Sequence, residues 1–287
     1  MNDEMKNKIY ISGFADEISS SLEKQIEILK QLGIPYVEMR GVNGKGLVEY
    51  SLEESIKIKE QLDSNGIKLS SVGSPIGKIA ITDDFEDHFT LFKHTVDIAN
   101  IMESPYIRMF SFFIPDGEKS EKYQDEVFRR IQKMVDYAAK KNVVLLHENE
   151  KDIYGDVADR CRKLMEEFYS GHFKAVFDFA NFVQCHQDTK VAYEMMKPYI
   201  EYIHIKDAIW ETGDVRPAGF GDGNVKEILS DLLHNGYSGF LSLEPHLADF
   251  TGFSSLENKK KSEKKKFTGE KAFILAFDSL QKILDQI

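Results

Sequence analysis

The sequence contains little cysteine. Among its 287 residues there are only two, Cys161 and Cys185, and neither has a second cysteine at CxxC spacing. We therefore expect no disulfide framework and no thiolate site that would select zinc, and we interpret both residues as structural thiols. Such sparing use of cysteine is typical of the reducing cytoplasm, which is the predicted location.

The sequence also lacks long apolar segments and an excess of positive charge. Residues 1–6 are polar, no apolar signal region follows them, and no stretch is long enough to span a bilayer. Acidic residues outnumber basic ones by 48 to 37, which gives a net charge of -11. This balance disfavours broad binding to nucleic acid or anionic membranes, so neither is expected as a partner. A lysine-rich run at residues 259–266 is interpreted as a solvated surface.

No GxGxxG turn follows the first predicted strand, which argues against a dinucleotide-binding fold. Instead, short apolar runs alternate with helical patterns along the chain. The expected strands are Ile9–Phe14, Tyr36–Arg40, Lys68–Gly73, Tyr106–Phe110, Val143–Glu148, Ala175–Asp178, Tyr202–Lys206 and Phe240–Glu244. The expected helices cover residues 22–32, 52–62, 85–102, 121–141, 157–169, 190–197, 225–234 and 269–284. This alternation predicts an α/β protein that forms a single (β/α)8 TIM barrel. No obvious linker divides the chain, so we expect residues 1–287 to form one domain.

Four of the predicted strands end in residues that can bind a metal ion. The fifth to eighth strands carry Glu148, Asp178, His204 and Glu244 near their C-terminal ends, and in a barrel these ends form one rim. Alternation places Glu148 in a row of core side chains, where a carboxylate is costly unless it is paired or binds a metal. Each acid alone could be a helix cap, but four in successive strands predict one site for Mn²⁺, Mg²⁺, Co²⁺ or Zn²⁺.

Further polar residues are expected around this site. Lys206 lies two residues beyond His204 on the same strand face, and His246 has the same relation to Glu244. The predicted substrate-binding set is Lys206, Asn181, His246, Arg108 and Lys78.

Two groups of residues, the charged residues inside the barrel and a glycine-rich segment, each allow two interpretations. Glu38, Arg40 and Arg108 share the interior-facing parity of their strands, so they either contact substrate or form a buried network beneath it. The glycine-rich segment 218–223 follows the seventh strand and opens a helix, where barrels often bind phosphate through backbone N–H groups. A plain glycine turn is the alternative, because Asp222 would repel a phosphate.

Taken together, the strand-end motifs resemble those of the xylose isomerase-like TIM-barrel superfamily, in particular its sugar phosphate isomerase/epimerase group. The resemblance covers nearly the whole chain and rests on the ordered set Leu146-His147-Glu148-Asn149, Phe177-Asp178-Phe179-Ala180-Asn181, His204-Ile205-Lys206-Asp207 and Leu243-Glu244-Pro245-His246. It implies that Glu148, Asp178, His204 and Glu244 are metal ligands. It also implies that the two glutamates move the protons of the substrate.

The sequence departs from the epimerase pattern at two positions. Asn181 stands where those enzymes usually have a histidine, and no arginine follows His204 closely, because Lys206 and Asp207 come first. These differences argue against epimerisation of free ketohexoses. Endonuclease IV uses several further histidines for a three-metal cluster. Most of the eight histidines here lie on predicted helices or away from strand ends, which argues against such a cluster.

The predicted function is a divalent-metal-dependent sugar or sugar phosphate isomerase/epimerase. It would act through an enediolate, with Glu148 and Glu244 as acid and base. The alternative is a metal-dependent lyase of the inosose or dehydroshikimate dehydratase type. A non-catalytic sugar-binding protein and a DNA-repair endonuclease are weaker alternatives. The expected partner is a small polyhydroxylated substrate, and homo-oligomerisation is left open.

Overall fold

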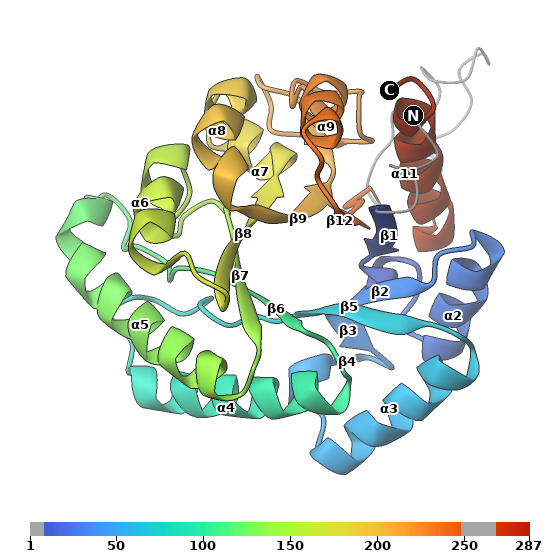
Figure 1. Ribbon diagram of the computed structural model, residues 1–287, viewed down its shortest axis with the longest axis horizontal. Coiled ribbons are helices and arrows are strands. Elements are labelled where there is room, and N and C mark those ends of the chain that lie inside the picture. The colour runs from blue at the N-terminus through green and yellow to red at the C-terminus, as the bar shows by residue number, and fades with distance from the viewer. Residues whose placement is uncertain (1–8, 248–267) are drawn as a thin grey trace.

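The computed structural model describes residues 9–247 and 268–287. Eight strands form one barrel-shaped sheet (Figure 1). They are β1 (Ile9–Gly13), β2 (Tyr36–Met39), β5 (Lys68–Gly73), β6 (Tyr106–Met109), β7 (Val144–Glu148), β8 (Phe173–Asp178), β9 (Ile200–Ile205) and β12 (Gly239–Leu243). Each lies within two residues of its predicted bounds.

The order of the strands in the sheet is β1–β12–β9–β8–β7–β6–β5–β2, and every neighbouring pair is parallel. The two outer strands meet through a parallel bridge between Phe14 and Glu38. The predicted TIM barrel is therefore confirmed. The carboxyl ends of all eight strands meet at one rim, as parallel pairing requires.

Helices surround the barrel (Figure 1). Those that were expected are α2 (Leu22–Gln31), α3 (Leu52–Ser64), α4 (Phe85–Ile101), α5 (Gln124–Lys140), α6 (Ala158–Phe168), α8 (Thr189–Met196), α9 (Val225–His234) and α11 (Gly269–Leu284). Side-chain caps begin several of them. Ser51 and Glu54 form a reciprocal capping box at α3, and Asp84 accepts from the N–H of Glu86 at α4.

Several short elements were not predicted. They are the helix α7 (Phe179–Gln184), the 3-10 helices η1 (Ala15–Glu17), η2 (Leu47–Glu49), η3 (Ser120–Tyr123) and η4 (Lys197–Tyr199), and two hairpins, β3 (Gly41–Val42) with β4 (Lys45–Gly46) and β10 (Asp207–Ala208) with β11 (Val215–Arg216). Segments of two to six residues carry too little hydrophobic periodicity to be recognised.

The core has two layers, as strand alternation requires. Most buried apolar side chains lie between strands and helices, whereas Leu146, Val176 and Tyr202 form a separate cluster. Leu146 belongs to the strand face that also carries Glu148, so the apolar cluster continues into the polar rim. No helix among residues 9–247 and 268–287 is long and apolar enough to cross a membrane. The lysine-rich run at 259–266 lies outside the described residues.

Candidate metal centre

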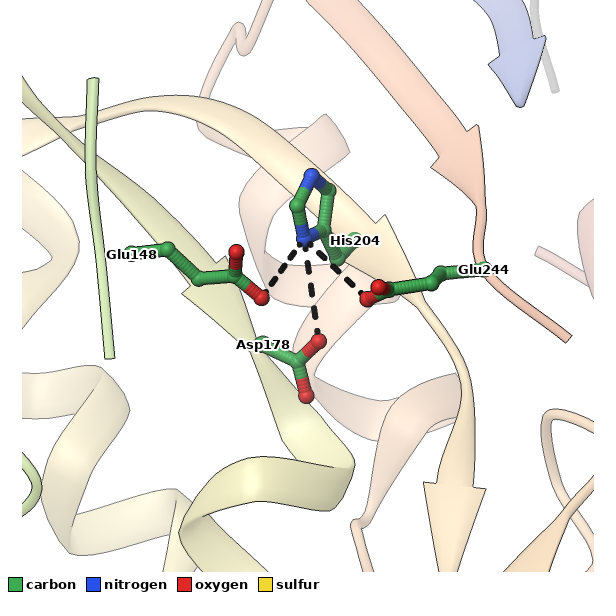
Figure 2. Close-up of side chains that lie close together, drawn as sticks. All are labelled: Glu148, Asp178, His204 and Glu244. Atoms are coloured by element: carbon green, nitrogen blue, oxygen red, sulfur yellow. Dashed lines mark hydrogen bonds and ion pairs between the residues drawn. The ribbon is translucent and has the colours of Figure 1, made fainter. Parts of the chain in front are cut away.

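Four neighbouring strand ends bring the predicted ligands together. Glu148 and Asp178 are the last residues of β7 and β8, His204 is in β9, and Glu244 follows β12. One ligand atom from each lies within 4.8 Å of the others, and all four residues are buried. Figure 2 shows the carboxyl groups pointing at one ring nitrogen of His204. That nitrogen, Nδ1, lies 3.0 Å from Glu148 Oε1, 3.5 Å from Glu244 Oε2 and 3.7 Å from Asp178 Oδ2.

The local charge balance fits a divalent cation. In the described part of the chain, four buried carboxylates, from Glu38, Glu148, Asp178 and Glu244, are accompanied by two buried permanent cations, Arg108 and Lys206. The half-buried Arg40 adds a third cation at the edge of the cluster, 3.5 Å from Glu244 Oε1. A second observation concerns Asp178 Oδ2, which is buried and accepts no hydrogen bond from the described residues. Lys206 Nζ is 3.1 Å from this oxygen, a contact with the distance of an ion pair but not the angles of a hydrogen bond.

The carboxylates around His204 determine its charge. Burial alone would lower the pKa of His204, but the carboxylates of Glu148 and Glu38 outweigh it and raise that pKa well above its usual value. His204 is therefore protonated at neutral pH in the metal-free chain. Carboxylate oxygens with one imidazole nitrogen form a donor set for Mn²⁺, Mg²⁺, Co²⁺ or Zn²⁺.

Each glutamate of the centre has its own basic partner. Arg108 Nη1 donates to Glu148 Oε2 at 3.0 Å, and Lys206 Nζ donates to Glu244 Oε2 at 2.7 Å. Burial would lower the pKa of Lys206, but Asp178 and Glu244 raise it well above its usual value, so the group stays an ammonium. Arg108 and Lys206, two of the three predicted substrate-binding cations, thus lie in the buried cluster and orient its carboxylates.

Asp178 serves two elements at once. Its Oδ1 accepts the N–H of Asn181 at 2.8 Å and so caps α7, while its Oδ2 faces the ligand cluster. The side chain of Asn181 in turn donates to Glu148 Oε1 at 3.2 Å. Asn149 pairs with the backbone N–H and C=O of Asp178, each at 3.0 Å. The helix-cap and ligand interpretations of Asp178 are therefore compatible, because each uses a different oxygen.

The other two predicted substrate residues lie further out. The side chain of His246 is 41% exposed, and its Nε2 is 3.4 Å from Glu244 Oε1 and 3.3 Å from Glu17 Oε1. Lys78 pairs with the half-buried Glu150 at 3.2 Å and lies over the ring of Phe110. His246 therefore borders the ligand cluster, whereas Lys78 has its own partner outside it.

Sequence reasoning missed Glu17. This residue ends η1, where no strand pattern marks it, and burial together with the nearby Glu244 raises its pKa to about 7. Arg40, noted only for its interior parity, lies 3.4 Å from Glu17 Oε1 and 3.5 Å from Glu244 Oε1. Only the fold brings these residues beside the eighth strand, so no local signal could have linked them.

The glycine-rich segment 218–223 binds a carboxylate of the chain itself. The N–H groups of Gly219, Gly221 and Gly223 donate to Asp207 at 3.1, 3.0 and 2.8 Å. A Cβ atom on Gly221 would lie 2.5 Å from Asp207 Oδ1, so the turn needs glycine there. These donors are used internally, and the alternative of a phosphate cradle on them is wrong.

Solved structures with the same fold include proteins of different activities. A zinc-bound structure of the IolI protein is 17% identical, with a TM-score of 0.74 over 97% of this chain and 98% of that one. The probable 3-DHS dehydratase AsbF of Bacillus anthracis is 16% identical, with a TM-score of 0.73 over 97% and 100%. The 3-keto-D-glucoside 4-epimerase YcjR of E. coli is 15% identical, with a TM-score of 0.68 over 97% and 99%. At these identities the likeness shows the fold alone.

Comparison with curated protein sequences finds no match. The model of one protein family matches residues 26–266, which is most of the chain and includes all four strand ends of the metal centre. With this match, the barrel topology and the strand-end motifs, the chain belongs to the xylose isomerase-like TIM barrel family.

Proposed function

We propose that this protein is a divalent-metal-dependent isomerase or epimerase of a small polyhydroxylated carbonyl compound. The observation that carries the proposal is the buried cluster of Glu148, Asp178, His204 and Glu244, whose donor atoms converge within 4.8 Å. The three glycine N–H groups of the segment 218–223 already donate to Asp207 and are not free for a phosphate. An unphosphorylated sugar is therefore the better candidate within this class.

The two glutamates suit opposite roles in proton transfer. Figure 2 shows Glu148 and Glu244 on opposite sides of the ring of His204, and β7 and β12 are three strands apart in the sheet. A planar enediolate bound between them would present one face to each carboxylate. One glutamate would then remove the proton and the other would return it.

Both carboxylates are ionised at neutral pH. Burial raises the pKa of Glu148, but His204 and Arg108 outweigh it and lower that pKa to about 2. In the same way Lys206 and His246 outweigh burial at Glu244, whose pKa falls well below its usual value. Weak bases of this kind need an acidified substrate C–H, and a bound divalent ion would supply this by polarising the adjacent oxygens.

The second candidate is a lyase that removes a β-hydroxyl group from a related substrate. Lys206 favours this alternative, because its buried ammonium could bind the departing oxygen. Its Nζ lies 3.1 Å from Asp178 Oδ2 and 2.7 Å from Glu244 Oε2. The raised pKa of Lys206 makes it a poor proton donor, so its suitable role is to orient that oxygen.

Incubation of the Mn²⁺-loaded protein with a panel of sugars and keto-acids in D₂O would test the proposal by proton NMR. Solvent deuterium should enter the carbon next to a carbonyl, and an epimer or aldose–ketose isomer should accumulate. Loss of water to give a conjugated carbonyl would favour the lyase instead. Binding of Mn²⁺ without exchange on any sugar that binds would favour a non-catalytic sugar-binding protein, and cleavage of abasic DNA would favour the nuclease.

A further inference from the structure

His204 has a second partner on the side away from the ligand cluster. Its Nε2 lies 3.1 Å from Glu38 Oε2. Glu38 is in β2, which is separated from β9 by β1 and β12 around the barrel, so this contact crosses the interior. Both residues are completely buried.

Glu38 has few other contacts that would explain its burial. Oε2 also accepts the hydroxyl of Ser242 at 2.7 Å, and Oε1 has no hydrogen-bond partner in the described part of the chain. No lysine or arginine among those residues forms an ion pair with Glu38. A buried carboxylate without a permanent cation is costly, so its presence requires an interaction of comparable strength.

We infer that Glu38 is a positioning residue that fixes the tautomer and the ring orientation of His204 for metal binding. In the neutral imidazole, the single N–H is at Nε2 and donates to Glu38. The lone pair of Nδ1 is then directed toward Glu148, Asp178 and Glu244. This inference rests on the metal centre of the proposed function and assigns to Glu38 a role outside the four ligands.

The surroundings of the ring support this role. Ser242 is the register neighbour of His204 in β12, so the hydroxyl that holds Glu38 is fixed by the sheet itself. The ring of Phe14 meets the imidazole edge-on at 5.3 Å, and the ring of Tyr202 does so at 5.8 Å. These rings restrict where the imidazole lies, and within residues 9–247 and 268–287 Glu38 is the hydrogen-bond partner of Nε2.

Zn²⁺ affinity, measured by competition with a chromophoric chelator, would test the role of Glu38. Glu38→Leu removes the acceptor and should weaken Zn²⁺ binding ~10- to 100-fold, the usual effect of losing a partner behind a ligand histidine. Glu38→Gln keeps an amide oxygen as acceptor and should restore part of the affinity. Ser70→Ala is the matched control, because Ser70 is an equally buried barrel hydroxyl bonded to Ser12 and Tyr202, not to Glu38.

A spectroscopic signal separates positioning from a general loss of stability. In the Zn²⁺-loaded protein with ¹⁵N-labelled histidine, His204 should show a protected Nε2–H proton. In Glu38→Gln this proton signal should move upfield, because a neutral amide is a weaker acceptor than a carboxylate. In Glu38→Leu it should disappear.

An unchanged Nε2–H signal in Glu38→Gln would overturn the inference even if Glu38→Leu does not fold. So would a Zn²⁺ affinity of Glu38→Leu equal to that of Ser70→Ala. Failure of the unmodified protein to bind Zn²⁺ would instead contradict the metal centre, and with it the proposed function.

Discussion

Glu148 and Glu244 each have an oxygen near Nδ1 of His204 and a cationic partner, Arg108 for the first and Lys206 for the second. Replacement by glutamine keeps the size of the side chain and one oxygen, but removes the proton acceptor. We predict that Glu148→Gln and Glu244→Gln each lower turnover by ~10²-fold or more, in line with general acid–base contributions.

Deuterium exchange would separate the two roles. One variant should still exchange the substrate hydrogen with solvent but fail to form product. In that variant the remaining glutamate removes the proton, and the replaced glutamate is the one that returns it. A matched control is Glu150→Gln, which changes a rim carboxylate that pairs with Lys78. Near-normal turnover in Glu148→Gln or Glu244→Gln, with metal retained, would refute the mechanism of two glutamates.

Asp178 allows metal binding to be separated from folding. In Asp178→Asn the side-chain oxygen can still cap α7 through the N–H of Asn181, but the negative charge beside Lys206 is lost. We predict that the variant loses Zn²⁺ and Mn²⁺ binding, while its far-ultraviolet circular dichroism stays unchanged. Asp84→Asn, at the cap of α4, is the control that should keep metal binding. Global unfolding of Asp178→Asn would show that Asp178 is structural.

The loop after β9 is an element organised around one carboxylate. Asp207 accepts four backbone N–H groups, from Ala208 and from the three glycines of the 218–223 segment. Asp207→Ala leaves these donors without their acceptor, and each buried unsatisfied donor costs about 1–3 kcal/mol. We predict a clear loss of stability in urea and faster amide exchange at Gly219, Gly221 and Gly223.

The position of Asp207 next to Lys206 gives this loop a second consequence. A loosened loop should raise KM more than it lowers kcat, because Glu148 and Glu244, the proposed acid and base, lie at the ends of other strands. Asp214→Ala is the control, since Asp214 lies in the same loop but is exposed and pairs with Arg216 at the surface. Equal stability of Asp207→Ala and Asp214→Ala would contradict the anchoring role.

At the scale of the whole molecule, two buried histidines, His88 and His147, make the free energy of unfolding depend on pH. Burial and Arg130 lower the pKa of His88 to about 4, and burial lowers the pKa of His147 to about 4 as well. Both are neutral in the folded chain, where His88 Nε2 accepts the N–H of Gly77 and His147 contacts Ser111.

The sign of the effect follows from proton binding. The unfolded chain takes up protons near pH 6.5, whereas the folded chain resists protonation down to about pH 4. The stability from these groups is thus present above pH 6.5 and is lost as the pH falls from about 6.5 to about 4. Carboxyl groups with a raised pKa, such as Glu17, act in the opposite direction, so the test is a comparison of two proteins. Between pH 6.5 and 4 the urea midpoint of the unmodified chain should fall more than that of His88→Gln. Identical pH dependence of the two midpoints would contradict this account.

Metal binding should stabilise the entire molecule. An ion that binds only the folded barrel should, at 100 times its Kd, add ~2.7 kcal/mol to the free energy of unfolding. Because His204 is protonated in the metal-free chain, binding should release about one proton per chain, and affinity should rise with pH. Calorimetry in buffers of different ionisation enthalpy would count the protons. Zero release would contradict the protonated state of His204 in the metal-free chain.

Much of the fold and the meeting of the candidate metal ligands were predictable from the sequence, because both depend on patterns that are local in the chain. Apolar runs of four to six residues and helical periodicity follow from which faces are buried, so the eight strands and eight expected helices could be placed within three residues. Parallel strands in sequence order must present their carboxyl ends together. The positions of Glu148, Asp178, His204 and Glu244 at four such ends therefore predicted that they would meet.

Tertiary structure alone decided which partner each of these residues has. Glu38 meets His204 and Arg40 meets Glu244 through contacts that span 166 and 204 residues of sequence and leave no periodic signal. The same holds for the glycine segment, which is compatible with a phosphate site in sequence but binds Asp207 in space. Hydrophobic patterning specifies which side of a strand is buried, whereas the pairing of polar groups inside a barrel depends on curvature and register around the closed sheet.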